Sequence, residues 1–283
     1  MKFRVRPLFF QHMPRMLLPT LARLLSSSVY AVRYHIADKL LLPLIQPGYG
    51  RKRRAATHPL FLAGKAFALC RGTGIEIGAL HRRLPLLANV FYLDLRATSA
   101  LLDRYNKDRN VDHIGQVQLI TTGSRYPFLD SDALDFVASS HVIEHTVNPS
   151  RQIEEWLRIV RPGGIIYIIA PDKRYCFDRR REATSLEHFI DEYQSDTDSV
   201  SMDHYRDFII NTHGEDGINH NTSDAYIAAQ HATQANIHVH TFTEKSFREF
   251  LDHFAPVLGY DVIHYSAYLL NIHAALRKRS PVN

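Results

Sequence analysis

The chain has 283 residues, of which 45% are hydrophobic and 22% charged, a composition that excludes wholesale disorder and fibrous repeats. Its two cysteines are too few for a disulfide framework and indicate a reducing compartment. The net charge of +5 is unevenly distributed, because residues 1–56 hold 11 Lys and Arg against the single acid Asp38. That segment carries +10 and residues 57–283 carry −5. The global charge therefore does not by itself predict nucleic-acid binding.

Residues 1–56 are predicted to form a basic N-terminal helical arm, because apolar residues recur at helical spacing between Leu17 and Leu44. The longest apolar run, residues 40–45, is far shorter than the ~20 residues of a membrane span. The arm fits a helix lying on an anionic membrane surface, a helix packed on the rest of the chain, or an organellar transit peptide. It lacks the pattern of a secretory signal, so we expect a cytoplasmic protein, either free or peripheral to a membrane.

The rest of the chain alternates short apolar runs with helical patterns. A helix is predicted from Asn148-Pro149, and the segment Arg161-Pro162-Gly163-Gly164 is expected to end it. Near-continuous apolar strands separated by helices predict a parallel sheet covered on both faces, a doubly wound α/β fold with ligands at the carboxyl ends of the strands. The expected strands are 74–78, 90–94, 117–120, 134–139 and 165–170, with a closing antiparallel pair at 260–265 and 270–276.

The glycine pattern disfavours phosphate-bearing cofactors. Gly72 and Gly74 stand before and at the start of the first expected strand and only Gly78 stands at its end, so the fingerprint of a dinucleotide-binding turn is incomplete. A phosphate-binding loop of the nucleotide-triphosphatase type is also missing from the sequence.

Five motifs in order carry a family resemblance. They are Glu76-Ile77-Gly78-Ala79, Asp94 at the end of the second strand, Tyr126-Pro127-Phe128 leading to Leu134-Asp135-Phe136-Val137, Ser140 to His145, and Leu157 to Gly164. Together they resemble the class I S-adenosylmethionine (SAM)-dependent methyltransferases with a type-11-like domain, over about residues 70–172 and a closing region at 241–278. The resemblance implies a Rossmann-like seven-stranded sheet with a C-terminal antiparallel strand pair, a methyltransferase domain over residues 57–283, and SAM as cofactor.

The residue types agree with SAM, which carries a carboxylate, an ammonium group and a ribose but no phosphate. A tight turn at Gly78 can offer backbone N–H groups to the carboxylate, and Asp94 can accept hydrogen bonds from the ribose hydroxyls. Taken singly, Gly78 is also explained as a packing turn and Asp94 as a helix cap. The segments at Ala79 and Thr121 depart from the family pattern, which has further glycines at the first and often an acid at the second. The cofactor-binding residues expected are Glu76, Gly78, Ala79, Asp94, Gly123, Ser124 and Ser140.

The string His141-x-x-Glu144-His145 follows the fourth strand. It resembles the Glu-x-x-Glu-His metal site of small-RNA 2′-O-methyltransferases and ubiquinone-pathway O-methyltransferases, with His141 in place of the first Glu. The resemblance implies a divalent metal such as zinc, held by His141, Glu144, His145, His238 and His240. If residues 238–240 are extended, both of their rings face one side. The interpretation we favour needs no metal, and makes His141 or His145 the catalytic base.

An insertion at about residues 172–240 is expected to cover the acceptor as a substrate lid. It resembles a bacterial subset of the family with a PDKRY-FDR pattern, and Lys173, Arg174, Arg179 and Arg181 are candidates to bind a carboxylate or phosphate. An equally good interpretation pairs these arginines locally with Asp172, Asp178 and Glu182.

The predicted function is SAM-dependent methyl transfer, and the acceptor that we favour is an oxygen of a small molecule or glycan. The Asn/Asp-Pro-Pro-Tyr motif of enzymes that methylate nucleobase amines is missing, and nucleic acid is not an expected partner. Two alternatives stay open: a metal-dependent RNA 2′-O-methyltransferase, and a degenerate, non-catalytic binding module.

Overall fold

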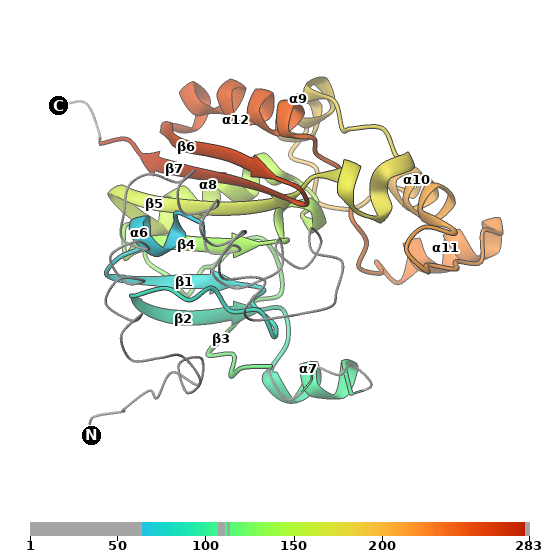
Figure 1. Cartoon of the computed structure of the whole chain (residues 1–283), viewed down its shortest axis with the longest axis horizontal. Coiled ribbons are helices and arrows are strands. Elements are labelled where there is room, and N and C mark those ends of the chain that lie inside the picture. Colours follow the sequence, from blue (N-terminus) through green and yellow to red (C-terminus); the bar gives the residue numbers. More distant parts are fainter. Residues whose placement is uncertain (1–63, 107–110, 112–113, 281–283) are drawn as a thin grey trace, which may run out of the picture. The chain divides into compact units, whose positions relative to one another are not determined.

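The computed structural model describes residues 64–106, 111 and 114–280 (Figure 1). The chain divides into two units, residues 1–51 and 52–283, and every described residue belongs to the second. The predicted basic arm and its boundary at residue 57 lie outside the described residues. Within the described part of the chain, we find no helix with the length and apolar character needed to cross a membrane.

The described residues build one seven-stranded sheet with the order β3-β2-β1-β4-β5-β7-β6. The pairs from β3 through to β5 are parallel, whereas β7 runs antiparallel to both β5 and β6. The predicted fold class, a doubly wound sheet with an antiparallel pair at its C-terminal end, is confirmed. The strands are β1 (Thr73–Ile77), β2 (Asn89–Asp94), β3 (Leu119–Ile120), β4 (Leu134–Ser140), β5 (Val160–Pro171), β6 (Tyr260–Tyr268) and β7 (Asn271–Lys278).

The strand order reverses between β1 and β4, which are neighbours in the sheet with Ile77 opposite Ser139. From this point the chain runs outward through β2 and β3 on one side and through β5 on the other. In open parallel sheets, ligands bind at the carboxyl ends of the strands beside such a reversal. The segments that follow β1 and β4 are therefore the first places to look for a site.

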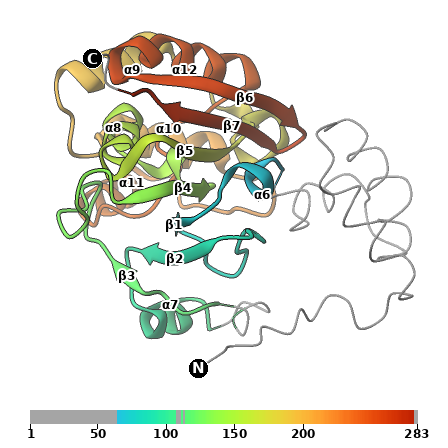
Figure 2. The same ribbon diagram turned by 90° about the vertical axis from the view of Figure 1, so that its left-hand side faces the viewer.

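The two faces of the sheet are covered by different elements. Val137 and Ile168 pack in a core with helices α8 (Pro149–Ile159), α9 (Leu186–Gln194) and α12 (Glu244–Leu258). Their strand neighbours Phe136 and Tyr167 face the other way, toward helix α6 (Ala66–Leu69), as alternation along a strand requires. Figure 2 shows α8 and α6 on opposite sides of the sheet. Apolar strands buried on both faces thus follow from the continuous apolar runs of the sequence.

Helix α8 begins where the sequence predicts, because the Asn148 side chain accepts a hydrogen bond from the N–H of Arg151 and Pro149 opens the first turn. The expected spacer Arg161–Gly164 is not a separate turn. It forms the irregular start of β5, which follows the helix directly and shifts its register against β4. Gly163, at φ 76°, supplies the bend, and Arg161 is held by an ion pair of 2.6 Å with Asp135.

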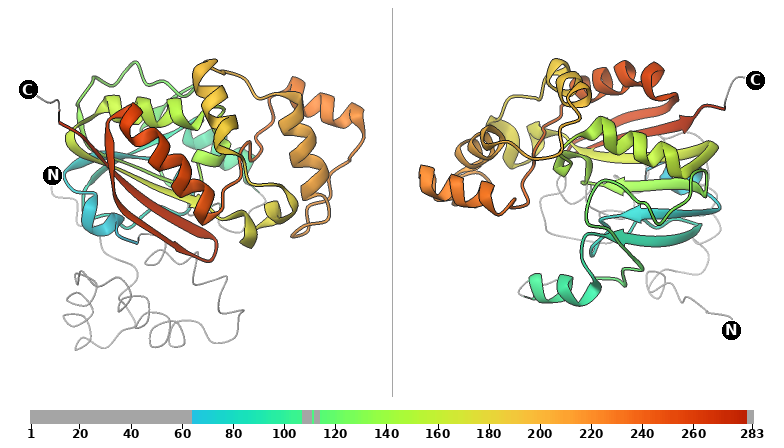
Figure 3. Two further views of the ribbon diagram at one scale, coloured as in Figure 1. Left: turned by 90° about the horizontal axis from the view of Figure 1, so that it is seen from above. Right: turned by 180° about the vertical axis from the view of Figure 1, so that it is seen from behind.

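Two connections differ from a regular alternation of strand and helix. Between β1 and β2 the chain makes turns without a helix, whereas α7 (Thr98–Arg104) follows β2. After β5, two short turns, η5 (Lys173–Tyr175) and η6 (Phe177–Arg180), lead into α9, α10 (Met202–Thr212) and α11 (Asp224–Ala232). Figure 3 shows α10 and α11 projecting beyond the sheet. This insertion has a small apolar core of its own, which includes Tyr205, Phe208 and Ile227.

Candidate functional site

The turn after β1 is built around Gly78. Its φ of 65° lies in the left-handed region that favours glycine, and its N–H donates to the carbonyl of Leu93 over 3.0 Å. A Cβ atom at this position would lie 2.8 Å from Cγ2 of Val142, in the segment that follows β4. The predicted cofactor turn and the histidine motif therefore touch each other at the carboxyl edge of the sheet.

Glu76 lies in β1 just before this turn and is buried. Its Oε1 accepts a hydrogen bond of 2.9 Å from the N–H of Leu84, while its Oε2 has no partner among the described residues. Burial raises the pKa of Glu76 to about 8. A buried carboxyl with a free oxygen fits a residue that recognises a cationic ligand group, such as the ammonium group of SAM.

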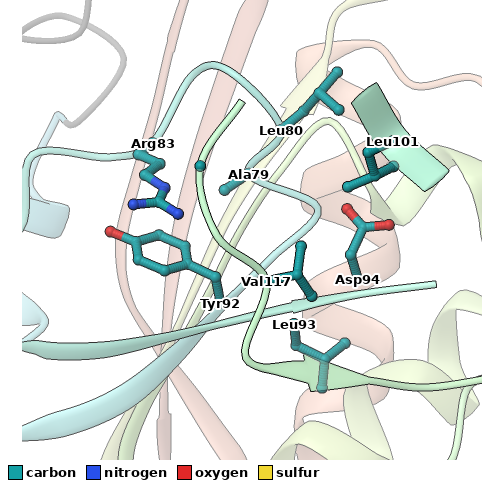
Figure 4. Close-up of a pocket in the computed structure, with 9 residues that line it drawn as sticks. Ala79, Leu80, Arg83, Tyr92, Leu93, Asp94, Leu101 and Val117 are labelled. Atoms are coloured by element: carbon teal, nitrogen blue, oxygen red, sulfur yellow. The ribbon is translucent and has the colours of Figure 1, made fainter. Parts of the chain in front are cut away.

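Asp94 ends β2 and lines a pocket together with Ala79, so the structure brings two of the predicted cofactor residues together (Figure 4). Across the pocket, the guanidinium of Arg83 lies 3.6 Å from the ring centroid of Tyr92. Burial raises the pKa of the Asp94 carboxyl, against the hydrogen bonds that it accepts from the backbone N–H groups of Leu95 and Arg96.

The remaining predicted cofactor residues lie around this edge of the sheet. Gly123 and Ser124 are exposed in the loop after β3, where the Thr121 hydroxyl donates to the carbonyl of Gly123 over 3.0 Å. They do not line the pocket of Asp94. Ser140 is the last residue of β4 and lies opposite Ile169 of β5.

His141 stands directly after β4 with a φ of 55°, a left-handed conformation that costs a residue with a Cβ roughly 1–2 kcal/mol. Its N–H donates to the carbonyl of Ile169, and its Nε2 lies 2.9 Å from Oδ1 of Asn271 in β7. Burial lowers the pKa of His141 to about 4. Such strain in a polar residue at a strand end is characteristic of functional sites.

Three side chains then converge, and we call Glu144, His145 and His238 the Glu144 cluster; their ligand atoms lie within 4.8 Å of one another. Glu144 belongs to the turn η4 (Ile143–His145) and is fully buried, and neither of its oxygens has a hydrogen-bond partner among the described residues. The Nε2 atoms of His145 and His238 each lie 3.9 Å from Glu144 Oε1, and His141 Nδ1 lies 3.8 Å from it. Burial raises the pKa of Glu144 to about 7.

The two imidazole rings of the Glu144 cluster are each held by a contact at Nδ1, the nitrogen on the side away from Glu144. His145 Nδ1 lies 2.8 Å from the carbonyl of Ile237, which can only accept, so Nδ1 carries the hydrogen and Nε2 is left as an acceptor. His238 Nδ1 lies 2.6 Å from Asp178. Burial would raise the pKa of Asp178, but its contacts with His238 and Arg181 outweigh burial and lower it. Burial, with the neighbouring His238, lowers the pKa of His145 to about 3, so this ring is neutral.

The Glu144 cluster offers one carboxylate and two imidazoles, a set of donor groups that fits a divalent metal. The buried carboxylate of Glu144 has no hydrogen-bond partner among the described residues, and imidazole nitrogens face it at 3.8–3.9 Å, which leaves room for a cation between them. His240 does not join this set. The segment bends at His240, so the two rings do not face one side as expected, and His240 Nε2 lies 3.1 Å from Glu192 instead.

Three of the four predicted substrate-binding cations are paired within the protein. Arg174 binds Asp172 through two nitrogens, Arg179 binds Glu215 and Asp216, and Arg181 is buried between Asp178 and Asp207. Arg181 also donates to the carbonyls of His238 and Val239. The structure thus favours local pairing for Arg174 and Arg181. The half-buried Lys173 donates to the carbonyl of Arg179 over 3.3 Å.

Sequence reasoning missed several partners of the site. Asp178, which holds His238, and Asn271, which holds His141, come from distant segments, and no local pattern points to them. By contrast, His188 and Glu192 are four residues apart on α9, and that spacing places both on one helix face. It was available in the sequence as a signal of a polar cluster.

Comparison with known proteins finds one matching domain family. Residues 69–168 match the family model of a methyltransferase domain. Similar solved structures include SAM-dependent methyltransferases from Aquifex aeolicus (13% identity, TM-score 0.41, 84% of this chain and 97% of that chain) and Mesorhizobium loti (12%, 0.44, 78% and 98%). A third comes from Thermotoga maritima (14%, 0.44, 87% and 100%). No curated protein matches the sequence.

The family match, the strand order and the motif residues together define the domain as a class I methyltransferase. Residues 69–168 thus carry the methyltransferase domain, and its motif residues gather where the strand order of the sheet reverses.

Proposed function

We propose that this methyltransferase transfers the methyl group of SAM to a hydroxyl oxygen of a small-molecule or saccharide acceptor. The observation that supports this most directly is the orientation of His145. Its Nδ1–H is bound to the carbonyl of Ile237, and its Nε2 is an acceptor beside the buried Glu144. A neutral, fixed imidazole is the group that a hydroxyl nucleophile needs to lose its proton.

When bound, SAM supplies a methyl group on a sulfonium centre. The turn at Gly78 and the carboxylate of Asp94 would hold its polar groups, next to the segment that follows β4. His145 Nε2 would accept the proton that the acceptor hydroxyl gives up as its oxygen takes the methyl group. Glu144, whose Oε1 lies 3.9 Å from that nitrogen, would then stabilise the imidazolium. The remaining contribution of the protein is alignment of the two reactants.

The Glu144 cluster also favours a second candidate, metal-dependent O-methylation. Glu144, His145 and His238 would hold the ion, which would lower the pKa of an acceptor hydroxyl without a protein base. The pairing of Arg174, Arg179 and Arg181 with acids leaves these cations less suited to an RNA backbone, and so supports a small acceptor in either case.

The test uses SAM labelled in its methyl group, incubated with the protein and fractionated cell extract. We expect label in a product that withstands alkali, as an ether does and a methyl ester does not. His145→Gln is expected to lower kcat by roughly 10²–10⁴-fold with SAM affinity unchanged, whereas the exposed His253→Gln serves as a matched control. Activity that requires a divalent ion whose binding is lost in His145→Gln would select the metal-dependent form.

Label on nitrogen or carbon would refute O-methylation. SAM binding without any labelled acceptor would instead support the binding-module alternative.

A further inference from the structure

A second group of histidines lies outside the proposed active site. His188, Glu192, His204 and His240, which we call the Glu192 cluster, offer three imidazole nitrogens and one carboxylate, with ligand atoms within 4.8 Å of one another. Glu192 and His240 are buried, whereas the side chains of His204 and His188 are 17% and 39% exposed. The cluster is therefore anchored in the protein and reachable from solvent on one side.

The distances within the cluster match one tetrahedral ion. His188 Nε2 lies 3.0 Å from Glu192 Oε1 and 3.1 Å from His204 Nε2. His240 Nε2 lies 3.1 Å and His204 Nε2 3.9 Å from Glu192 Oε1. Ligands of a tetrahedral zinc ion, at about 2.0–2.1 Å from the metal, stand ~3.3–3.4 Å from each other. Three of the separations are hydrogen-bond distances a few tenths of an ångström below that value and the fourth is longer, so small shifts of these side chains would admit one ion.

The contacts that hold the side chains of the Glu192 cluster agree with metal ligation through the Nε2 atoms of its histidines. His188 and Glu192 share one face of α9 because they are four residues apart. His204 Nδ1 lies 2.8 Å from the hydroxyl of Ser201, an outer contact of the kind that orients metal-binding imidazoles. His240 Nδ1 is buried without a partner among the described residues, so this ring is held through its Nε2.

We propose that the Glu192 cluster binds one zinc ion, as a structural site with all four ligands supplied by the protein. Three histidines and one carboxylate suit zinc, and a closed tetrahedral shell is typical of structural rather than catalytic sites. The ion joins the successive helices α9 and α10 to the segment before α12, which lies further along the sequence.

The site also positions the proposed active site. His240 follows His238 by two residues, and the N–H of His240 donates to the carbonyl of Glu144 over 3.1 Å. Fixing the His240 ring therefore fixes the segment that carries His238 to the Glu144 cluster. The zinc proposal itself does not depend on O-methylation, since it concerns binding and stability.

The experiment loads the chelator-treated full chain with cobalt(II) and with zinc. For the Glu192 cluster we expect a tight equivalent with the strong visible absorption of tetrahedral cobalt, and a zinc-dependent rise in Tm. His204→Gln should abolish both, lowering zinc affinity more than the roughly 10–100-fold that loss of an outer-shell partner costs. The matched variant His145→Gln, in the Glu144 cluster, should retain them.

Three results would overturn the proposal: no tight zinc equivalent in the wild type, retention of the tetrahedral spectrum in His204→Gln, or its loss in His145→Gln alone. If His204→Gln does not fold, His188→Gln at the more exposed position replaces it with the same expectation. X-ray absorption of the zinc-loaded wild type gives an independent readout, because three imidazoles and one carboxylate are expected. A shell completed by water would contradict a closed structural site.

Discussion

Asp94 shows how one carboxylate acquires a role from its position. It ends β2 inside a pocket that it shares with Ala79, and the neighbouring backbone N–H groups hold its oxygens at that place. We expect Asp94→Ala to weaken SAM binding by about 1–3 kcal/mol, since hydrogen bonds to a charged group are lost. Calorimetric titration measures this. Asp252→Ala, on the exposed side of α12, is the control, and equal affinity in both variants would remove Asp94 from the cofactor site.

The raised pKa of Glu76 predicts how the stability of the protein depends on pH. Burial raises its pKa from 4.5 to about 8, so the folded protein keeps a proton that the unfolded chain releases. The free energy of unfolding is therefore lowered as the pH rises from about 4.5 to about 8. Glu76→Gln keeps an acceptor for the Leu84 N–H and cannot ionise. We expect its stability relative to wild type to improve between pH 5 and pH 8.5, measured by urea unfolding.

The exposed Glu249→Gln on α12 is the control for Glu76, and its stability difference from wild type should not change with pH in this way. A difference for Glu76→Gln that stays constant across the same range would contradict a raised pKa in the folded protein.

Among the elements, the turns after β1 and before the main part of β5 make a matched pair. Gly78 and Gly163 both have a positive φ, but a Cβ would approach Val142 to 2.8 Å only at Gly78, while Gly163 faces open space. Gly163→Ala should cost about 1–2 kcal/mol of unfolding free energy from its backbone alone. Gly78→Ala should cost more and also weaken SAM binding. Urea unfolding with calorimetry tests this, and equal losses with intact SAM binding would contradict it.

The insertion after β5 shows a different relation between charge and structure. Its arginines look like an anion-binding patch in the sequence, yet Arg179 is satisfied by Glu215 and Asp216, and Arg181 by Asp178 and Asp207. The buried Arg181 ties η6 to α10 and, through two backbone carbonyls, to the segment that carries His238. Its charge therefore organises the neighbourhood of the Glu144 cluster.

For the whole molecule, the excess positive charge and the predicted cofactor residues lie in different parts of the chain. The seven strands and their hydrophobic clusters lie within residues 66–278, whereas the +10 segment is residues 1–56. We expect deletion of residues 1–54 to leave SAM affinity unchanged, because the predicted cofactor residues all follow residue 70. Calorimetry on the truncated chain, with circular dichroism to verify folding, checks this. A folded truncation that no longer binds SAM would give the first segment a part in the cofactor site.

The sequence by itself determined the fold class and the location of the motifs. Apolar runs such as residues 165–170 must be buried on both faces. Gly78 and Asp94 stand where the apolar runs of β1 and β2 end, so a parallel sheet places both at the same edge. These features depend on periodicity and on backbone conformation, which neighbouring residues decide. The start of β5 was misjudged, because a strand can pass through a glycine bend that locally resembles a turn.

Only the tertiary structure decided which polar groups meet. His238 and His240 are two residues apart, yet one faces Glu144 and Asp178 and the other Glu192. Arg179 finds acids 36 and 37 residues away, and His141 finds an asparagine 130 residues away. Such partners are set by the path of the chain through the insertion and the sheet. The physical reason is that burying a charge or an imidazole is favourable only with a partner, and long-range packing selects that partner.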